Sequence, residues 1–371
     1  MHSVFGNHGK KIVVSSIAVS LLLLMSACSS SSTQSTAGLD PEADLTKQSL
    51  VISNWAAYNP PDLAASFQKA LGAKMTITNH ATNEEIMAKL TSGADSGIDV
   101  AFVSGQYAQV LAAQGLLEPI DAALIPNLRN LYPEASNLSY DVGNKFSVPY
   151  TWGTTGICYR KDLTGFDPTS WNDLLNPAAN VKGKTTMLAT ERWLMLPAQK
   201  LLGISANSTS ASDMEKVKAQ LIATKKTLLA YDDTTFYTRL VSGEASMVEA
   251  WDGWCNYGIT DNKNIKFVIP KEGSDLWVDT MVILKTSKNK EAAHAFINYI
   301  LDPTVNSWVI SNVLYKTPDK AAMDLTAPKL GITYPNMLMT PAELLKGEGL
   351  TDLGASGPMY TKTATEVTSS K

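Results

Sequence analysis

The 371-residue sequence predicts an α/β protein of two lobes, each a mainly parallel sheet flanked by helices, with a hinged cleft between them. Three observations predict this fold. Apolar stretches of strand length alternate with amphipathic stretches of helix length, which is typical of parallel sheets crossed by helices. The alternation starts again after residue 160. Two extended stretches, near 150–156 and 277–284, lie where the chain would cross between the lobes.

The composition is that of a globular protein, with 44% hydrophobic and 18% charged residues. The net charge of −4 gives no reason to expect a nucleic-acid partner, which would call for a basic surface. A mildly acidic chain is compatible with a small cationic ligand, but it is equally compatible with many other ligands.

The N-terminal segment predicts export. Lys10 and Lys11 precede an apolar core at 12–24, which has the length of a signal peptide rather than of a membrane span. The core ends in Met-Ser-Ala-Cys at 25–28, which resembles a bacterial lipobox. We therefore expect a signal peptide at 1–27, lipidation of Cys28 and a flexible tether at 28–47. A plain secretory signal or an interrupted membrane anchor is the alternative.

No later stretch of the sequence reaches transmembrane length, so we expect the rest of the chain to be a soluble body held to a bacterial membrane by its lipid. The predicted location is therefore periplasmic or at the cell surface.

The first lobe is predicted from a β-α-β-α-β pattern. Ligands bind such sheets beyond the carboxyl ends of the strands, which here are the stretches 55–58, 79–82 and 104–107. The strands are expected at 49–54, 74–78 and 98–103, and the helices at 60–71, 83–90 and 107–114.

A second α/β pattern follows the extended stretch at 147–159. Trp251 to Trp254 come at the carboxyl end of one of its strands, where the same rule places ligand contacts. Strands are expected at 185–188, 245–250 and 266–269, and helices at 169–175, 194–202, 213–229, 236–242 and 290–301.

The stretch 275–284 carries an aspartate into an apolar strand. Trp277 and Asp279 share one face because alternate residues of a strand do. A carboxylate in such a place is costly unless it is paired. Its partner is either a distant basic residue or backbone donor, or a ligand cation stacked on Trp277.

No pattern in the sequence predicts an enzyme, a cofactor or a metal site. A nucleophile elbow, a zinc-binding H-E-x-x-H and a phosphate-binding glycine loop are all missing from the sequence. Cys158 and Cys255 lie outside any C-x-x-C arrangement, and the sequence leaves open whether they form a disulfide or stay as free thiols.

Several segments together resemble the bacterial periplasmic spermidine/putrescine-binding proteins, the receptors of polyamine ABC importers. The resemblance runs from about Leu50 to Tyr360. It rests on S-N-W-A-A-Y-N-P-P at 53–61, V-P-Y-T-W-G-T-T-G at 148–156, T-S-W-N-D-L at 169–174, F-V-I-P-K-E-G at 267–273, W-V-D at 277–279 and Y-K-T-P at 315–318.

The resemblance implies a two-lobed type II periplasmic binding protein fold that closes on an amine. The implied lobes are 48–152 with 278–322, and 153–277 with 323–371. In the matched ligand pocket, Asp279 pairs with an ammonium group, aromatic side chains form a box around the cation, and a serine lies after the third strand. The implied ligand-binding residues are Trp55, Tyr58, Ser104, Trp251, Trp277, Asp279 and Tyr315.

The chain departs from the family pattern where further acids are expected. Ala57 replaces an acid before the tyrosine, Thr190 and Trp193 replace acids of the second lobe, and Leu350 replaces a glutamine. Glu191, Asp252 or Asp233 could take the place of these acids. The residues that could complete the site are Glu191, Trp193, Asp252, Trp254 and Gln106.

The sequence therefore predicts a lipid-anchored, monomeric substrate-binding protein of an ABC importer, with membrane permease subunits as partners. The predicted ligand is a small organic cation, with a polyamine as first choice. Another amine, such as a quaternary ammonium or an amino-acid-derived cation, and a sensory receptor of the same fold remain alternatives.

Overall fold

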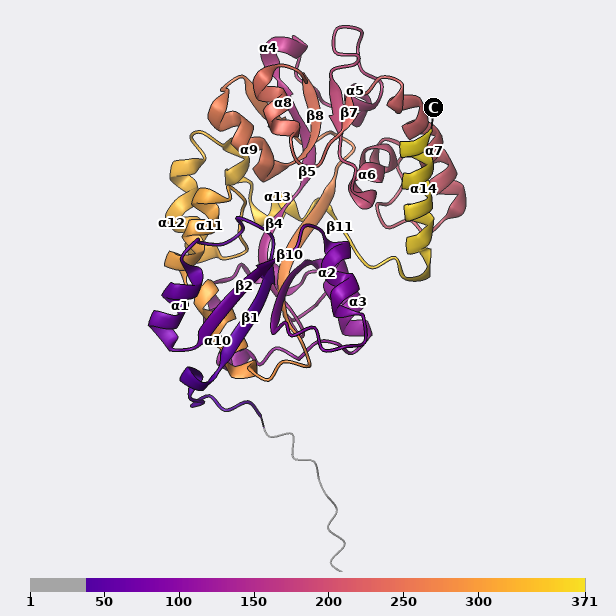
Figure 1. Cartoon of the computed structure of the whole chain (residues 1–371). Coiled ribbons are helices and arrows are strands. Elements are labelled where there is room, and N and C mark those ends of the chain that lie inside the picture. The colour runs from indigo at the N-terminus through magenta and orange to yellow at the C-terminus, as the bar shows by residue number, and fades with distance from the viewer. Residues whose placement is uncertain (1–37, 371) are drawn as a thin grey trace, which may run out of the picture. The chain divides into compact units, whose positions relative to one another are not determined.

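The computed structural model describes residues 38–370, so the predicted signal peptide, Cys28 and most of the tether lie outside the described residues. Within the described residues, the chain from residue 39 onward forms one compact unit with two sheets (Figure 1). No helix in the described part of the chain combines the length and hydrophobicity needed to cross a bilayer.

The first sheet contains the three parallel strands predicted from the N-terminal pattern. β1 (Ser49–Asn54) lies between β2 (Lys74–Asn79) and β3 (Val100–Ser104) and is parallel to both. β10 (Asp275–Ile283) then pairs with β3 in the antiparallel sense. β4 (Val148–Gly153) and β11 (Glu348–Gly349) also pair with β10.

The second sheet has the strand order β7-β6-β8-β5-β9. β6 is parallel to β7 and β8, whereas β5 is antiparallel to β8 and β9. The strands are β5 (Thr155–Arg160), β6 (Thr185–Met187), β7 (Ala230–Tyr231), β8 (Met247–Trp251) and β9 (Ile265–Val268).

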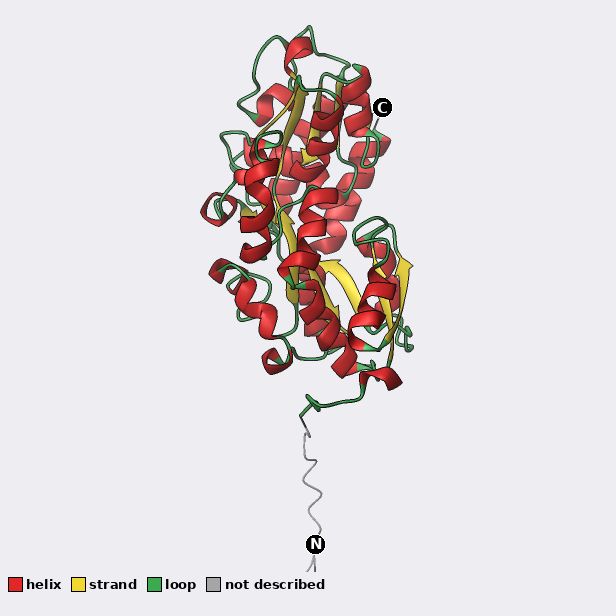
Figure 2. Cartoon of the chain, turned by 90° about the vertical axis from the view of Figure 1, so that its left-hand side faces the viewer, coloured by secondary structure: helices red, strands yellow, loops and turns green. Residues whose placement is uncertain are grey.

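Helices lie on both sides of the strands (Figure 2). Helices are needed on both sides because both faces of a central strand such as β3 are apolar. Val100 and Phe102 of β3 belong to one hydrophobic core, and Ala101 and Val103 belong to another. The helices of the N-terminal pattern and those after β10 are α1 (Leu63–Leu71), α2 (Asn83–Leu90), α3 (Gly105–Ala113), α10 (Lys290–Ile300), α11 (Pro303–Asn312) and α12 (Lys320–Leu330).

The remaining helices follow the second pattern of the sequence and the C-terminal segment. They are α4 (Lys161–Thr164), α5 (Trp171–Leu175), α6 (Glu191–Leu201), α7 (Ala211–Lys225), α8 (Phe236–Ser242), α9 (Asp252–Asp261), α13 (Pro341–Leu344) and α14 (Gly357–Ser369).

Several helix ends differ from the sequence prediction. α1 begins at Leu63 rather than at the predicted proline, and it ends as predicted at Gly72, whose φ of 87° is left-handed. α6 begins at Glu191, earlier than predicted, because Asp233 accepts hydrogen bonds from the backbone just before the helix. α7 ends at Lys225, before the predicted end at 229.

The chain crosses between the sheets at Thr154, which separates β4 from β5. The sequence suggested one extended connection here, but the structure divides it between the two sheets. Cys158 of β5 and Cys255 of α9 form a disulfide with their Cα atoms 5.8 Å apart, which settles the alternative that the sequence left open.

Candidate ligand-binding site

Asp279 lies on β10 where this strand runs between β3 and β4. Its register partners are Ser104, the last residue of β3, and Thr151 of β4. The Ser104 hydroxyl donates to Oδ1 of Asp279 at 2.7 Å, and the Tyr58 hydroxyl donates to Oδ2 at 2.8 Å. The Tyr58 and Thr151 hydroxyls are 2.6 Å apart. We call Tyr58, Ser104, Thr151 and Asp279 the Asp279 cluster.

The carboxylate of this cluster has neutral partners only. In the part of the chain that the structure describes, Asp279 makes no ion pair, and its side chain is partly exposed. Burial raises the pKa of Asp279 to about 6, while the hydrogen bonds from Ser104, Tyr58 and Thr151 oppose this rise. A cation placed beside the carboxylate would favour its ionised form.

A series of aromatic contacts extends from Tyr58 of the Asp279 cluster. The ring centroids of Trp55 and Tyr58 are 5.6 Å apart, those of Tyr58 and Tyr315 are 6.1 Å apart, and those of Tyr315 and Trp277 are 4.9 Å apart, all edge-to-face. Trp55 also lies 4.8 Å from the buried ring of His80. The structure thus brings together six of the seven residues that the resemblance implies.

Two glycines let the aromatic side chains approach the backbone. A Cβ on Gly153 would lie 2.2 Å from Cζ2 of Trp277, and a Cβ on Gly253 would lie 1.7 Å from the ring of Tyr315. Neither position has room for a side chain, so glycine is required at both. The sequence reasoning did not single out these glycines.

Trp251, the seventh implied residue, belongs to a second aromatic group. Its ring lies 5.5 Å from that of Trp193 and 6.3 Å from that of Phe236. The indole N–H of Trp193 donates to Oδ2 of Asp275 at 2.8 Å. Asp275, Trp277 and Asp279 alternate along β10 and therefore share a face.

Asp252 is not free to act as a further anchor. Its carboxylate forms an ion pair with Lys316, and the two side chains are 0% and 1% exposed. The Asp252 backbone carbonyl also accepts from the side chain of Asn336 at 2.9 Å. The sequence reasoning missed Lys316, which is 64 positions away along the chain.

The remaining candidates make no hydrogen bond to the Asp279 cluster within the described residues. Trp254 packs against Phe236 and Tyr237 at centroid distances of 5.4 and 5.8 Å. Glu191 accepts a hydrogen bond from Thr361 at 3.1 Å. The buried Gln106 lines a small cavity beside Leu350, and its amide nitrogen has no hydrogen-bond partner among the described residues.

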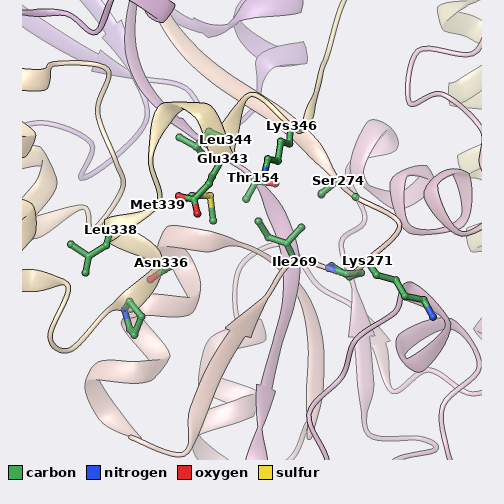
Figure 3. Close-up of a pocket in the computed structure, with 14 residues that line it drawn as sticks. Thr154, Ile269, Lys271, Ser274, Asn336, Leu338, Met339, Glu343, Leu344 and Lys346 are labelled. Carbon is green, nitrogen blue, oxygen red and sulfur yellow. The ribbon is translucent and has the colours of Figure 1, made fainter.

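A cavity of about 670 Å³ lies elsewhere, between the turn before β10 and the C-terminal segment (Figure 3). Lys271 and Ser274 line it from the turn, and Met339 and Lys346 line it from the other side. Neither Asp279 nor the aromatic residues near it line this cavity, so the cavity and the Asp279 cluster are separate features.

A family model described as bacterial extracellular solute-binding protein matches residues 62–311. The chain belongs to this family. The solute-binding protein is 31% identical to the spermidine/putrescine-binding periplasmic protein of Escherichia coli over 84% of this chain and 89% of the relative. It is 29% identical to the putrescine/cadaverine-binding protein of Pseudomonas aeruginosa over 76% of this chain and 83% of the relative.

The fold of the solute-binding protein also matches that of solved structures. The spermidine/putrescine ABC transporter substrate-binding protein from Streptococcus pneumoniae superimposes with a TM-score of 0.74 at 28% identity, covering 86% of this chain and 98% of the other. The Tp0655 lipoprotein of Treponema pallidum shares the fold, with a TM-score of 0.77. The two-lobed binding-protein fold expected from the sequence is confirmed.

Proposed function

We propose that this solute-binding protein is the lipid-anchored receptor of an ABC importer and that it captures a small organic cation of the polyamine class. The observation that carries the proposal is the Asp279 cluster. Among the described residues the Asp279 carboxylate has no basic partner, it is hydrogen-bonded to Tyr58, and the Tyr58 ring contacts further aromatic rings. This combination is suited to an ammonium group.

The proposed binding mode combines a charge with ring faces. The ammonium group approaches Asp279, while the methylene chain lies against Trp55, Trp277 and Tyr315. A cation that loses its water against an aromatic face gains about 2 kcal/mol. A charge-assisted hydrogen bond to the carboxylate adds about 1.5–3 kcal/mol.

Closure of the two lobes would complete the site. Tyr58, Ser104 and Thr151 of the proposed first lobe and Trp251 of the second lie on either side of the strand connections at Thr154 and β10. A hinge at these connections would allow solute to enter and would then exclude water from the carboxylate. The closed form would dock on the permease subunits, and the lipid on Cys28 would hold the protein at the membrane.

A thermal-shift screen with spermidine, putrescine, choline and betaine tests the ligand class, because a ligand that binds the native state raises its melting temperature. Putrescine or spermidine at millimolar concentration should raise the melting temperature of the mature protein by several degrees. No shift with either polyamine would refute the polyamine assignment.

Asp279→Asn should remove most of the shift while leaving the unliganded melting temperature within a few degrees of the wild-type value. Asp261→Asn is the matched control, because Asp261 is exposed at the end of α9 and makes no side-chain hydrogen bond or ion pair within residues 38–370. Equal ligand shifts in Asp279→Asn and the wild type would overturn the role of Asp279.

The lipid anchor is tested separately with Cys28→Ser. This variant should be released from the membrane fraction, and a variant that stays membrane-bound would refute lipidation of Cys28.

A further inference from the structure

Two carboxyl groups of the lobe that carries Trp251, Asp252 and Asp233, already have partners within the protein. Asp252 is ion-paired with Lys316. Asp233 accepts hydrogen bonds from the backbone of Ala189 and from the hydroxyl of Thr190, at 2.7 and 3.1 Å. These groups therefore have partners within the protein before any ligand arrives.

Asp275 is the carboxylate most like Asp279 in its placement. It lies four positions earlier on the same face of β10, which puts the two Cα atoms roughly 13 Å apart along an extended strand, with Trp277 between them. A linear ligand with an amine at each end could in principle place one ammonium group at Asp275 and the other at Asp279.

The environment of Asp275 prevents this. Asp275 is fully buried, and it accepts hydrogen bonds from the Thr155 N–H at 2.8 Å, the Trp193 indole at 2.8 Å and the Ser274 hydroxyl at 3.2 Å. Trp193, itself only 6% exposed, packs edge-to-face on Trp251. The Trp193 indole therefore already occupies a hydrogen-bonding position on the Asp275 carboxylate that a second ammonium group would need.

Glu249 of β8 adds a further acidic group near Asp275. It is fully buried, it accepts one hydrogen bond from the Leu188 N–H at 3.1 Å, and its other oxygen has no partner among the described residues. Burial raises the pKa of both Glu249 and Asp275, and the nearby Asp275 raises the pKa of Glu249 further. No basic side chain within the described residues forms an ion pair with either group.

We propose that the ligand site compensates a single positive charge, at Asp279, and that Trp193, fixed by its hydrogen bond to Asp275, is the specificity residue that closes the site to a second ammonium group. This inference rests on the proposed function, because it concerns the same site. The inference restricts the proposed ligands to amines that bind with only one ammonium group buried in the site.

The matched ligand pair that tests the inference is n-butylamine and putrescine, which share a four-carbon chain and differ by one ammonium group. Dissociation constants are measured by isothermal titration calorimetry at pH 7.5. For the wild-type protein, putrescine should bind no more than about threefold tighter than n-butylamine, since the second charge finds no carboxylate.

Trp193→Ala should uncover Asp275 and increase the preference for putrescine over n-butylamine at least tenfold. Adding Asp275→Asn to Trp193→Ala should return the preference to the wild-type value. Trp193→Phe keeps an aromatic ring without the N–H and is the folding control. Its melting temperature, compared with that of Trp193→Ala, shows whether any loss of binding comes from unfolding.

The outcomes separate the inference from the proposed function. If the wild type binds both amines but prefers putrescine by more than about threefold, the single-charge site is refuted and the proposed function stands. An unchanged preference in folded Trp193→Ala would likewise refute the role of Trp193. If neither amine binds the wild type, the proposed function fails and this inference fails with it.

Discussion

The ammonium group of Lys316 is ion-paired with the carboxylate of Asp252, and both side chains are almost completely buried. Lys316 follows the aromatic Tyr315, and Asp252 follows the aromatic Trp251 and precedes the glycine against which Tyr315 packs. The ion pair thus connects the segments that carry two aromatic residues of the proposed ligand site, Trp251 and Tyr315.

Removal of one partner of this pair should destabilise the protein strongly. Lys316→Met leaves a buried carboxylate without a counter-charge, and we expect the free energy of unfolding to fall by about 3–5 kcal/mol. Urea denaturation measures this change. The double variant Lys316→Met with Asp252→Asn should recover most of the loss, because neither charge remains.

The control for that experiment is Lys320→Met, which breaks the exposed pair with Asp324 and should lower the free energy of unfolding far less than Lys316→Met does, because solvent screens an exposed pair. A loss in Lys316→Met no larger than in Lys320→Met would contradict the importance of the buried pair.

Ligand affinity should depend on pH through Asp279. The pKa of Asp279 is raised to about 6 by burial, so at pH 5 most of the unliganded protein carries a neutral carboxyl group there. An ammonium ligand binds the ionised form, so the dissociation constant should fall about tenfold between pH 5 and pH 7 and then level off. Calorimetric titrations across this range check the prediction.

Other groups near the site should not produce this dependence. Burial lowers the pKa of His80 to about 4, so His80 stays neutral from pH 5 to 7, and burial raises the pKa of Tyr58 well above its usual value. Asp279 should affect the stability of the unliganded protein in the opposite direction. Between the ordinary pKa of an aspartate and about pH 6, the native state keeps a proton on Asp279 that the unfolded chain has lost. The contribution of Asp279 to the free energy of unfolding therefore falls as the pH rises through this range.

Gly153→Ala should weaken ligand binding. The added methyl group would lie 2.2 Å from Trp277 and 2.5 Å from the carboxylate of Asp252, so at least one of them must move. Overpacking of this kind costs about 1–3 kcal/mol. If this cost raises the free energy of the ligand-bound protein relative to the unliganded protein, the affinity becomes roughly 5- to 150-fold weaker. Gly357→Ala, at an open position, is the control, and equal affinity of the two variants would count against the packing argument.

Ala57→Gly should stabilise the unliganded protein. Ala57 is exposed and has a φ of 57°, a left-handed conformation that costs an alanine roughly 1–2 kcal/mol. Glycine adopts it freely but loses more entropy on folding, so we expect a net gain of about 0.5–1 kcal/mol in urea denaturation. The neighbouring exposed Ala56, which has no positive φ, is the control: Ala56→Gly should give no gain.

The sequence allowed the order of strands and helices in the first lobe to be predicted, because β1 and β3 are short and largely apolar, β2 alternates apolar and polar residues, and amphipathic helices separate them. Tyr58, Ser104 and Asp279 could be proposed as neighbours from the resemblance. What could not be predicted depends on contacts between distant positions. The pairing of Lys316 with Asp252 and the hydrogen bond from Trp193 to Asp275 join residues 64 and 82 positions apart.

Local patterns were also insufficient where one residue decides the geometry. Thr154 interrupts an otherwise continuous extended stretch, and nothing in its neighbours predicts that the strands on either side join different sheets. Gly153 looks like any other strand glycine until the register places it opposite Trp277.

The disulfide between Cys158 and Cys255 has a consequence for the biogenesis of the protein. The covalent link spans 97 positions and encloses β6, β7 and β8, so the unfolded chain with the link intact is a large ring. The chain-entropy model gives such a ring about 4–5 kcal/mol of stabilisation over the open chain. Material produced in a reducing cytosol would lack that contribution, so oxidative maturation after translocation should decide how much of the protein survives proteolysis.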